Sequence, residues 1–340
     1  MLLPRGQAEE EREQDEEYDG HGPAGDAAEE VSSFEEDRVE PVHDRTYRPG
    51  GLRVPAAGRL STPPHVPAAV DAREIQARLK AVGVRPSRGL GQNFLIDDRV
   101  AARQLEHAGV RATDTVLEVG PGLGILTEHL AGAARHVVAV EADRRLAAAL
   151  EGRWPNVEVI RGDAVRVPWP PFDRMVANLP FSISSPITFR LLEHPFRRAS
   201  LMFQREFAER LTATAGTKDY SRLTVSAYCR STCRLAEDVP PSAFWPPPRV
   251  HSAVVVLEPR PRPFAVRDEA FFEAMVRALF THRRKMIGTT LQRAGKALGL
   301  RPGSAGEDPF AKRRVGELKP EQLGELADRL CPDRPGAAKS

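Results

Sequence analysis

Residues 115–127 read TVLEVGPGLGILT, and this stretch decides the fold. A short apolar run, interrupted by the acid Glu118, ends at Val119 and gives way to alternating glycines. From Ile125 to Leu130 apolar residues recur at helical spacing. The pattern predicts a strand, a tight turn and a helix. Glycine adopts backbone angles that a Cβ forbids and lets a ligand lie against the main chain, while the free N–H groups of the following helix point toward that ligand.

The spacing of the glycines narrows the kind of ligand. Gly120, Gly122 and Gly124 form G-x-G-x-G directly after an acidic residue, whereas turns that bind dinucleotides read G-x-G-x-x-G. The shorter motif suits a nucleoside whose tail carries no pyrophosphate. A glycine turn can also serve only to pack a helix on its sheet, so the motif alone leaves both interpretations open.

Two more apolar runs follow, at 136–143 and 157–164, and their acids Glu141 and Asp163 come at the carboxyl ends. Such runs are typical of buried parallel strands, whose carboxyl ends bind ligands in α/β sheets. Further strands are predicted over 172–181, 199–204, 223–235 and 251–259. Because strands alternate with helical patterns, we expect an α/β fold with a doubly wound, mostly parallel sheet and helices on both faces.

The composition divides the chain into three parts. Residues 1–67 are rich in acid, Gly, Pro and Ala and are predicted to form a disordered acidic tail. The strands and most helices fall in a main domain over 68–264. From 265 to 335 only helical patterns occur, which predicts a small helical C-terminal domain with a basic amphipathic helix. Such a helix is often only a solvated face over a core, but its charge also fits RNA contact.

The net charge of +2 hides a strong asymmetry. Residues 1–50 hold about 16 acids and 5 bases, so the remainder carries roughly +13. A basic folded body predicts a polyanionic partner, with nucleic acid as the first candidate, although surplus arginine can also serve solubility alone. The sequence contains neither a membrane-spanning apolar run nor a signal-peptide core, so we expect a cytoplasmic protein. The three cysteines and scattered histidines predict no metal site.

Glu141 lies about 20 residues after the glycine turn, where an acid can accept hydrogen bonds from both hydroxyls of a ribose. Asp163, at the end of the third strand, could accept a hydrogen bond from an adenine amine. Together they predict a nucleoside pocket. The alternative for Glu141 is a surface acid on a loop.

Asn178, Leu179, Pro180 and Phe181 are the predicted catalytic residues. The Asn178 side-chain oxygen and the Leu179 carbonyl can both accept from an exocyclic amine, Pro180 fixes the turn, and Phe181 offers a face to a base. Two acceptors aim the lone pair of a weakly nucleophilic aryl amine at an electrophile, so positioning replaces a strong base. The alternative is a strand-end turn with the asparagine as its cap.

Several motifs together resemble the ribosomal RNA adenine dimethyltransferase family, over residues from about 85 to 285. These motifs are GQNFL (91–95), EVGPGLG (118–124), VE (140–141), GDA (162–164), NLPF (178–181), QREFAERL (204–211) and FWPPPRVHSAV (244–254). The resemblance implies a Rossmann-like class I methyltransferase fold and S-adenosylmethionine as cofactor. The positions that match the family's cofactor site are Asn93, Leu95, Gly120, Glu141, Asp163 and Asn178, to which we add Gly122 from the same turn.

The resemblance also implies a function: dimethylation of adenosines in small-subunit rRNA during ribosome biogenesis, by a monomer acting on a pre-30S-type particle. The family's small-subunit members usually carry tyrosine at the position of Phe181. Stacking needs only the ring, but any hydroxyl contact is lost. The alternatives are a methylase of large-subunit rRNA, a non-catalytic assembly factor that keeps the fold, and a nicotinamide-dependent oxidoreductase, against which the G-x-G-x-G turn and NLPF both argue.

Overall fold

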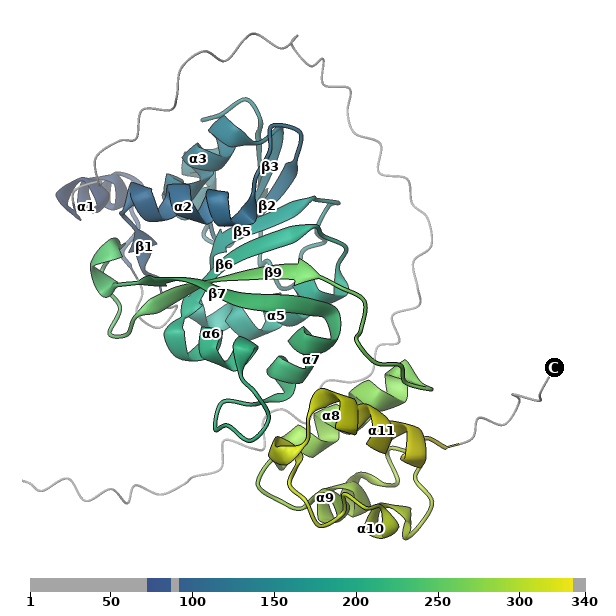
Figure 1. Ribbon diagram of the computed structural model, residues 1–340. Coiled ribbons are helices and arrows are strands. Elements are labelled where there is room, and N and C mark those ends of the chain that lie inside the picture. Colours follow the sequence, from purple (N-terminus) through teal and green to yellow (C-terminus); the bar gives the residue numbers. More distant parts are fainter. Residues whose placement is uncertain (1–71, 87–91, 333–340) are drawn as a thin grey trace, which may run out of the picture. The chain divides into compact units, whose positions relative to one another are not determined.

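The computed structural model describes residues 72–86 and 92–332 (Figure 1). The segment 1–67, predicted to be a disordered acidic tail, lies outside the described residues. The main sheet has seven strands, in chain order β2 (Thr115–Val119), β3 (His136–Glu141), β4 (Val157–Arg161), β5 (Arg174–Asn178), β6 (Arg198–Gln204), β7 (Ser231–Val239) and β9 (Ser252–Pro259).

The strands lie side by side in the order β4-β3-β2-β5-β6-β9-β7. The five strands from β4 to β6 are parallel, and β9 is antiparallel to both β6 and β7. The chain therefore runs outward from β2 to β4 and then returns to the other side of β2 with β5. Open α/β sheets bind ligands at the carboxyl ends of the strands where the order reverses in this way. The predicted doubly wound, mostly parallel sheet is confirmed.

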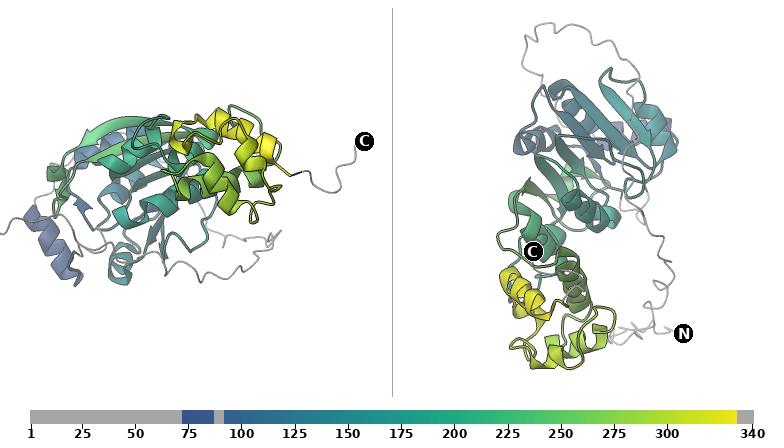
Figure 2. Two further views of the ribbon diagram at one scale, coloured as in Figure 1. Left: turned by 90° about the horizontal axis from the view of Figure 1, so that it is seen from below. Right: turned by 90° about the vertical axis from the view of Figure 1, so that its right-hand side faces the viewer.

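Helices cover both faces of the sheet (Figures 1 and 2). Alternate residues of a strand point to opposite faces, so Val116 packs in one apolar cluster and Leu117 in the other. The first cluster holds side chains from α1 (Ala72–Ala81), α2 (Asp98–Ala108), α3 (Ile125–Ala133) and α4 (Arg144–Leu150). The second holds side chains from α5 (Ser184–Glu193), α6 (Arg205–Thr212) and α7 (Arg222–Arg230).

The strand predicted over 223–235 is wrong for its first half. Residues 222–230 form α7, which begins at a capping box of Ser221 and Thr224, and β7 starts only at Ser231. Helix α7 is buried on two sides, with Leu223 and Ala227 against the sheet and Val225 and Cys229 against the C-terminal helices. Apolar residues at four alternate positions imitate the two-residue period of a strand.

The prediction that 157–164 is a buried strand is also wrong in one respect. A strand does form there, but β4 is the edge of the sheet, and Val157, Val159 and Ile160 are only half-buried. An edge strand keeps one side toward solvent, which explains the exposed Glu158 and Arg161 in the same strand.

After β9 the described residues form helices and no further strand of the sheets: α8 (Glu269–Thr281), α9 (Ile287–Ala294), α10 (Ser304–Glu307) and α11 (Pro320–Leu330). Their apolar side chains form a third cluster together with Tyr220, Val225 and Cys229. The domain limits 68–264 and 265–335 stay a prediction. Among the described residues, no helix is long and apolar enough to cross a membrane, and no group of three acids, histidines or cysteines could hold a metal ion.

Candidate active site

The predicted glycine turn follows β2 directly and leads into α3. Gly120 and Gly122 have φ of 71° and 59°, in the left-handed region that favours glycine. A Cβ on Gly120 would lie 3.2 Å from Pro180 Cδ, and one on Gly122 would lie 3.1 Å from Phe94 Cδ1. The turn therefore packs directly against two other predicted motifs, GQNFL and NLPF.

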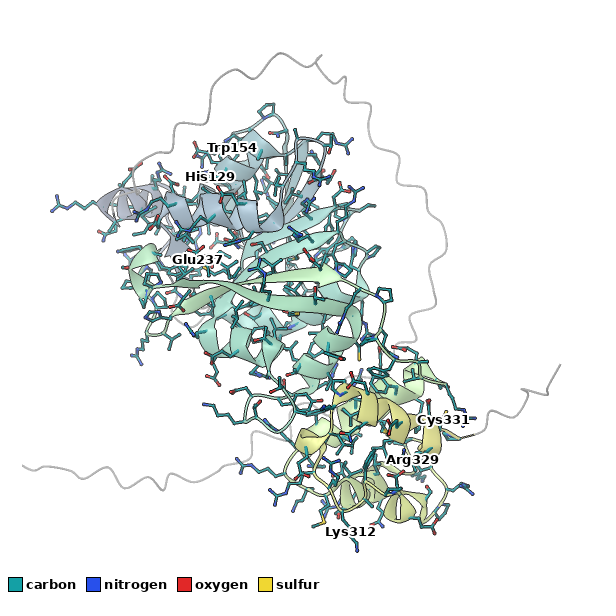
Figure 3. The ribbon with its side chains drawn as sticks, viewed as in Figure 1. His129, Trp154, Glu237, Lys312, Arg329 and Cys331 are labelled. Atoms are coloured by element: carbon teal, nitrogen blue, oxygen red, sulfur yellow. The ribbon has the colours of Figure 1, made fainter. Side chains whose placement is uncertain are left out.

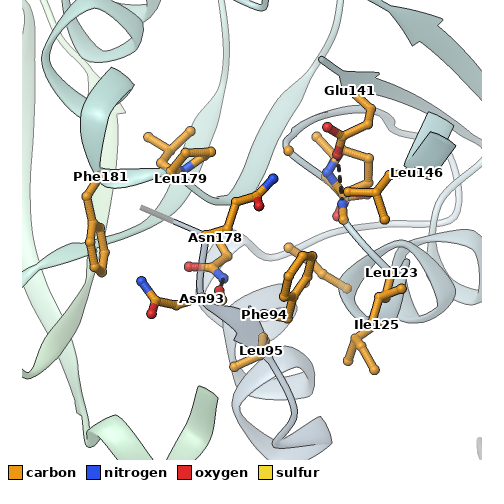
Figure 4. Close-up of a pocket in the computed structure, with 17 residues that line it drawn as sticks. Asn93, Phe94, Leu95, Leu123, Ile125, Glu141, Leu146, Asn178, Leu179 and Phe181 are labelled. Atoms are coloured by element: carbon orange, nitrogen blue, oxygen red, sulfur yellow. Dashed lines mark hydrogen bonds between the residues drawn. The ribbon is translucent and has the colours of Figure 1, made fainter. Parts of the chain in front are cut away.

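These three motifs wall one cavity at the carboxyl ends of β2, β3 and β5 (Figure 4). Its volume, with the open mouth, is about 710 Å³, within the range of small-molecule sites. The lining residues are Gln92, Asn93, Phe94, Leu95, Glu118, Gly120, Pro121, Gly122, Leu123, Ile125, Leu126, Glu141, Leu146, Asn178, Leu179, Pro180 and Phe181. All predicted site residues except Asp163 are in this set.

Glu141 ends β3 inside the cavity and is 7% exposed. Its Oε2 accepts a hydrogen bond from the Gly122 N–H at 3.0 Å, and its Oε1 accepts one from the Asp143 N–H at 2.9 Å. Burial raises the pKa of this carboxyl, and the backbone donors partly offset that shift. Glu141 thus holds the glycine turn in place through the Gly122 N–H. Each carboxyl oxygen keeps a second lone pair that can accept a hydrogen bond from a ligand. The alternative of a surface acid on a loop is wrong.

Asn178 is the last residue of β5. Helix α2 contacts β5 at Ala177, the residue before it. The buried Gln104 of α2 donates from Nε2 to the carbonyls of Ala177 and Ser200, at 2.9 and 3.1 Å. The Asn178 Nδ2 donates to the Asn93 carbonyl at 3.4 Å, so its Oδ1 is the acceptor left for a ligand.

The three residues after Asn178 also line the cavity and lead from the strand into a short helical turn. The Leu179 N–H donates to the Met202 carbonyl at 3.3 Å, and the short helical turn Phe181–Ile183 begins immediately after Pro180. In the view of Figure 4, Asn178 lies between the half-buried ring of Phe181 and the carboxyl of Glu141. The predicted base-stacking ring and the predicted cofactor residue Glu141 therefore line the same cavity, with Asn178 between them in this view.

Asn93 and Leu95 belong to a segment that closes the cavity from the side. Phe94 and Leu95 form the short strand β1 (Phe94–Leu95), which pairs antiparallel with β8 (Phe244–Trp245). The Ile96 N–H continues this pairing by donating to the Ala243 carbonyl at 2.9 Å. This two-stranded sheet could not be predicted, because two-residue strands are too short to show a period in the sequence.

Asp163 is the one predicted site residue that the structure does not bring to the cavity lining. Its Oδ1 accepts from the Val165 N–H at 2.9 Å, and Arg166 lies 3.5 Å from its Oδ2. The carboxylate caps the turn after β4 and is about half exposed.

Glu118 is a cavity residue that the predicted site did not include. It is 1% exposed, and its Oε2 is buried with no hydrogen-bond partner in the described structure. Burial raises its pKa to about 8, the nearby Glu141 adds to the shift, and a Thr127 hydroxyl opposes it. The two-residue period of β2 could have located it, because Glu118 shares a strand face with Val116, under α3.

The reversal of strand order beside β2, the glycine turn and the acid ending β3 define a class I methyltransferase fold of the Rossmann-like type, in which a nucleoside cofactor lies at this edge of the sheet. The sequence model of one family, "Ribosomal RNA adenine dimethylase", matches residues 85–300. The chain belongs to this family of S-adenosylmethionine-dependent methyltransferases.

Curated relatives agree with this membership. "Probable ribosomal RNA small subunit methyltransferase A" of Thermococcus gammatolerans is 46% identical over 246 residues, covering 71% of this chain and 87% of that protein. The protein of the same name from Methanothermobacter thermautotrophicus is 44% identical over 264 residues, covering 76% and 95%.

Two solved structures are similar over most of their length. A dimethyladenosine transferase from Plasmodium falciparum has a TM-score of 0.60 and 29% identity, covering 69% of this chain and 95% of its own. The 23S rRNA methyltransferase ErmE has a TM-score of 0.52 and 34% identity, covering 70% and 99%.

Proposed function

We propose that this protein dimethylates the exocyclic amine of adenosines in small-subunit ribosomal RNA, with S-adenosylmethionine as methyl donor. One observation carries the proposal: the residues suited to holding a target amine and those suited to holding a nucleoside cofactor wall the same cavity, with Pro180 against Gly120. The names of these two curated relatives support small-subunit rRNA as the substrate.

The residues of the cavity fit the donor. Glu141 is placed for ribose hydroxyls, and the turn at Gly120 and Gly122 allows close approach to the backbone. The orphaned carboxyl oxygen of Glu118 suits a cationic group. We retain Asn93, Leu95 and, by family resemblance, Asp163 as further cofactor residues. When bound, the donor supplies an electrophilic methyl group on a sulfonium.

The target base enters beside Phe181. Enzymes that modify a base inside a folded nucleic acid take it out of its stack, and the half-buried Phe181 ring offers a face as the replacement stacking surface. The Asn178 Oδ1 and the Leu179 carbonyl accept hydrogen bonds from the amine and direct its lone pair toward the methyl group. After one transfer the amine still has a hydrogen and a lone pair, so the same groups can orient it again.

Loops beside the C-terminal helices, together with the loop between α6 and α7, form a basic surface that provides a place for RNA phosphates; its Lys312 is labelled in Figure 3. We define it as Lys218, Arg283, Arg284, Lys285, Lys312, Arg313 and Arg314. Three segments distant in sequence carry these residues and are tied together by hydrogen bonds. Arg283 donates from Nη2 to the Thr217 carbonyl at 2.7 Å, and a β-bridge joins Met286 to Arg314.

The basic surface has few acids to neutralise it. Arg313 lies 3.6 Å from the Glu317 carboxylate, whereas Arg284, Lys285 and Arg314 are exposed and form no ion pair within the described part of the chain. The neighbouring Met286 is 51% exposed, an unusual position for a large apolar side chain. Unpaired cations around an exposed apolar group suit phosphates and bases of a polynucleotide.

We further infer that the protein acts as a monomer, in the cytoplasm, on a pre-30S-type particle during ribosome biogenesis. A second candidate function is methylation of large-subunit rRNA, which the similarity to the 23S rRNA methyltransferase ErmE favours. The two differ only in substrate.

Incubation of the full chain with radiolabelled S-adenosylmethionine and unmodified small or large ribosomal subunits separates the candidates. Nucleoside analysis should find dimethyladenosine in small-subunit rRNA alone, and the Asn178→Ala variant should form none. Label in the large subunit alone would favour the second candidate. No label in either, despite cofactor binding, would contradict both and leave an assembly factor of the same fold.

A further inference from the structure

The buried carboxyl of Glu118 has an oxygen that no group of the cavity wall satisfies. Glu141 uses both oxygens to bind backbone N–H groups, but Glu118 Oε2 reaches no donor in the described structure. Leaving a buried carboxylate oxygen without a partner is costly, and proteins avoid it unless the group is neutral or a ligand completes it. Glu118 also lines the cavity, so a ligand can reach it.

The cavity lining around Glu118 offers no cationic side chain to balance a negative charge. The cavity lining holds a second carboxyl, Glu141 of β3, and the amides of Gln92, Asn93 and Asn178, but no lysine, arginine or histidine. From α3, the buried Thr127 faces Glu118 with a hydroxyl. Two carboxyls and no base in an enclosed site disfavour a second negative charge and favour a cationic ligand.

We propose that Glu118 carries a proton in the free protein and releases it to solvent when the cationic methyl donor binds. The identity of the donor rests on the proposed function. The exchange is balanced: the O–H bond of the neutral carboxyl breaks, the proton passes to buffer, and the resulting carboxylate pairs with a positive group of the donor. No redox partner or further reactant takes part.

The raised pKa of Glu118, about 8, agrees with this placement. A group with that pKa is about nine-tenths protonated at pH 7, and a pairing cation lowers it again. The donor's own α-amino group, with an ordinary pKa near 7.7–8.0, is mostly charged at pH 7 and contributes little to proton exchange there.

Titration calorimetry with S-adenosylmethionine measures the exchange. In buffers of different ionisation enthalpy at pH 7, the observed binding enthalpy should change with a slope corresponding to release of about one proton. The Glu118→Gln variant should bind the donor at least tenfold more weakly and show a slope near zero. Glu128→Gln, which changes an exposed glutamate of the same helix that carries Thr127, should behave as the unaltered chain.

Two further measurements do not depend on the folding of a variant. They also identify which positive group of the donor pairs with Glu118. Infrared difference spectra of the unaltered chain should show a protonated carboxyl band that disappears when the donor binds. S-adenosylhomocysteine keeps the ammonium but lacks the sulfonium. Release with both ligands assigns the ammonium as the partner of Glu118, and release with the donor alone assigns the sulfonium.

The absence of buffer dependence at pH 7 would overturn the proposal, and so would an unchanged slope in Glu118→Gln. A failure to bind S-adenosylmethionine would overturn the donor assignment and this inference with it. Proton-linked binding without methylation of either ribosomal subunit would contradict the proposed function alone.

Discussion

The cavity at the end of β2 and the basic surface beside the C-terminal helices are opposite in electrical character. The described cavity lining contains two buried carboxyls and no base, whereas the basic surface gathers seven cations beside a single paired acid, Glu317. A cationic cofactor fits the first and a polyanion fits the second. The contrast teaches that one chain can direct two ligands of opposite charge to different places. The carboxyls of the cavity attract the cationic methyl donor and repel the phosphates of RNA.

The largest expected effect comes from the residue between the two ligands. Asn178→Ala should lower kcat for methyl transfer by a factor on the order of 10²–10³, as for the loss of one oriented polar contact to the reacting group. The affinity for rRNA, measured by filter binding, should stay unchanged. Ser182→Ala, an exposed change four positions away, is the matched control and should keep full activity. Equal losses in both variants would contradict the role of Asn178.

The next effect tests the basic surface. The triple variant R284Q/K285Q/R314Q should weaken rRNA binding by a factor on the order of 100 at 0.1 M salt and reduce the slope of log affinity against log salt by about 2–3, because three phosphate contacts are lost. Donor binding should not change. The control R293Q/K296Q/R301Q removes the same charge from exposed residues in the last turn of α9 and in the loop after it. Equal weakening in both triples would show that only net charge matters.

A smaller effect is expected at the entrance for the base. Phe181→Leu removes the stacking ring and should raise KM for rRNA about tenfold, since stacking of a base on an aromatic side chain contributes about 1–3 kcal/mol. Phe181→Tyr keeps the ring and should retain activity near that of the unaltered chain. Steady-state kinetics on small subunits measures both. A tyrosine variant as impaired as the leucine variant would rule out stacking as the function of this ring.

The smallest effect concerns stability in the free protein. The folded pKa of Glu118, about 8, lies above its ordinary value of 4.5, so the unfolded chain binds fewer protons between these values and stability falls as pH rises toward 8. Glu118→Gln should therefore raise Tm by a few degrees at pH 9 and less at pH 5. Thermal melts across this range test it, with Glu128→Gln as control. A constant difference at all pH values would contradict the raised pKa.

The centre of the fold could be predicted from the sequence because local and global signals agree there. The apolar runs of β2 and β3, the glycines between β2 and α3, and Glu141 each follow a short-range rule that burial in a parallel sheet enforces. Asn178 was predictable for the same reason, as the polar residue ending a buried strand.

Other features depend on contacts that no local pattern encodes. Helix α7 resembles a strand in sequence because two different cores bury it. The support of Asn178 by Gln104 and the pairing of Arg174 with Asp114, at 2.5 Å and buried, join residues more than 50 positions apart. Glu118 was visible as an acid before the glycine turn, but its missing partner is a property of the folded cavity alone.

The pairing of β1 with β8 also has a consequence for synthesis of the chain. Phe94 and Leu95 wall the cavity, yet their strand partners Phe244 and Trp245 are translated about 150 positions later. At 5–20 residues per second, the ribosome needs roughly 8–30 s to add them. The part of the cavity wall that Phe94 and Leu95 supply therefore gains its strand partner only after the FWPPP segment emerges, when the glycine turn has long been outside the ribosome.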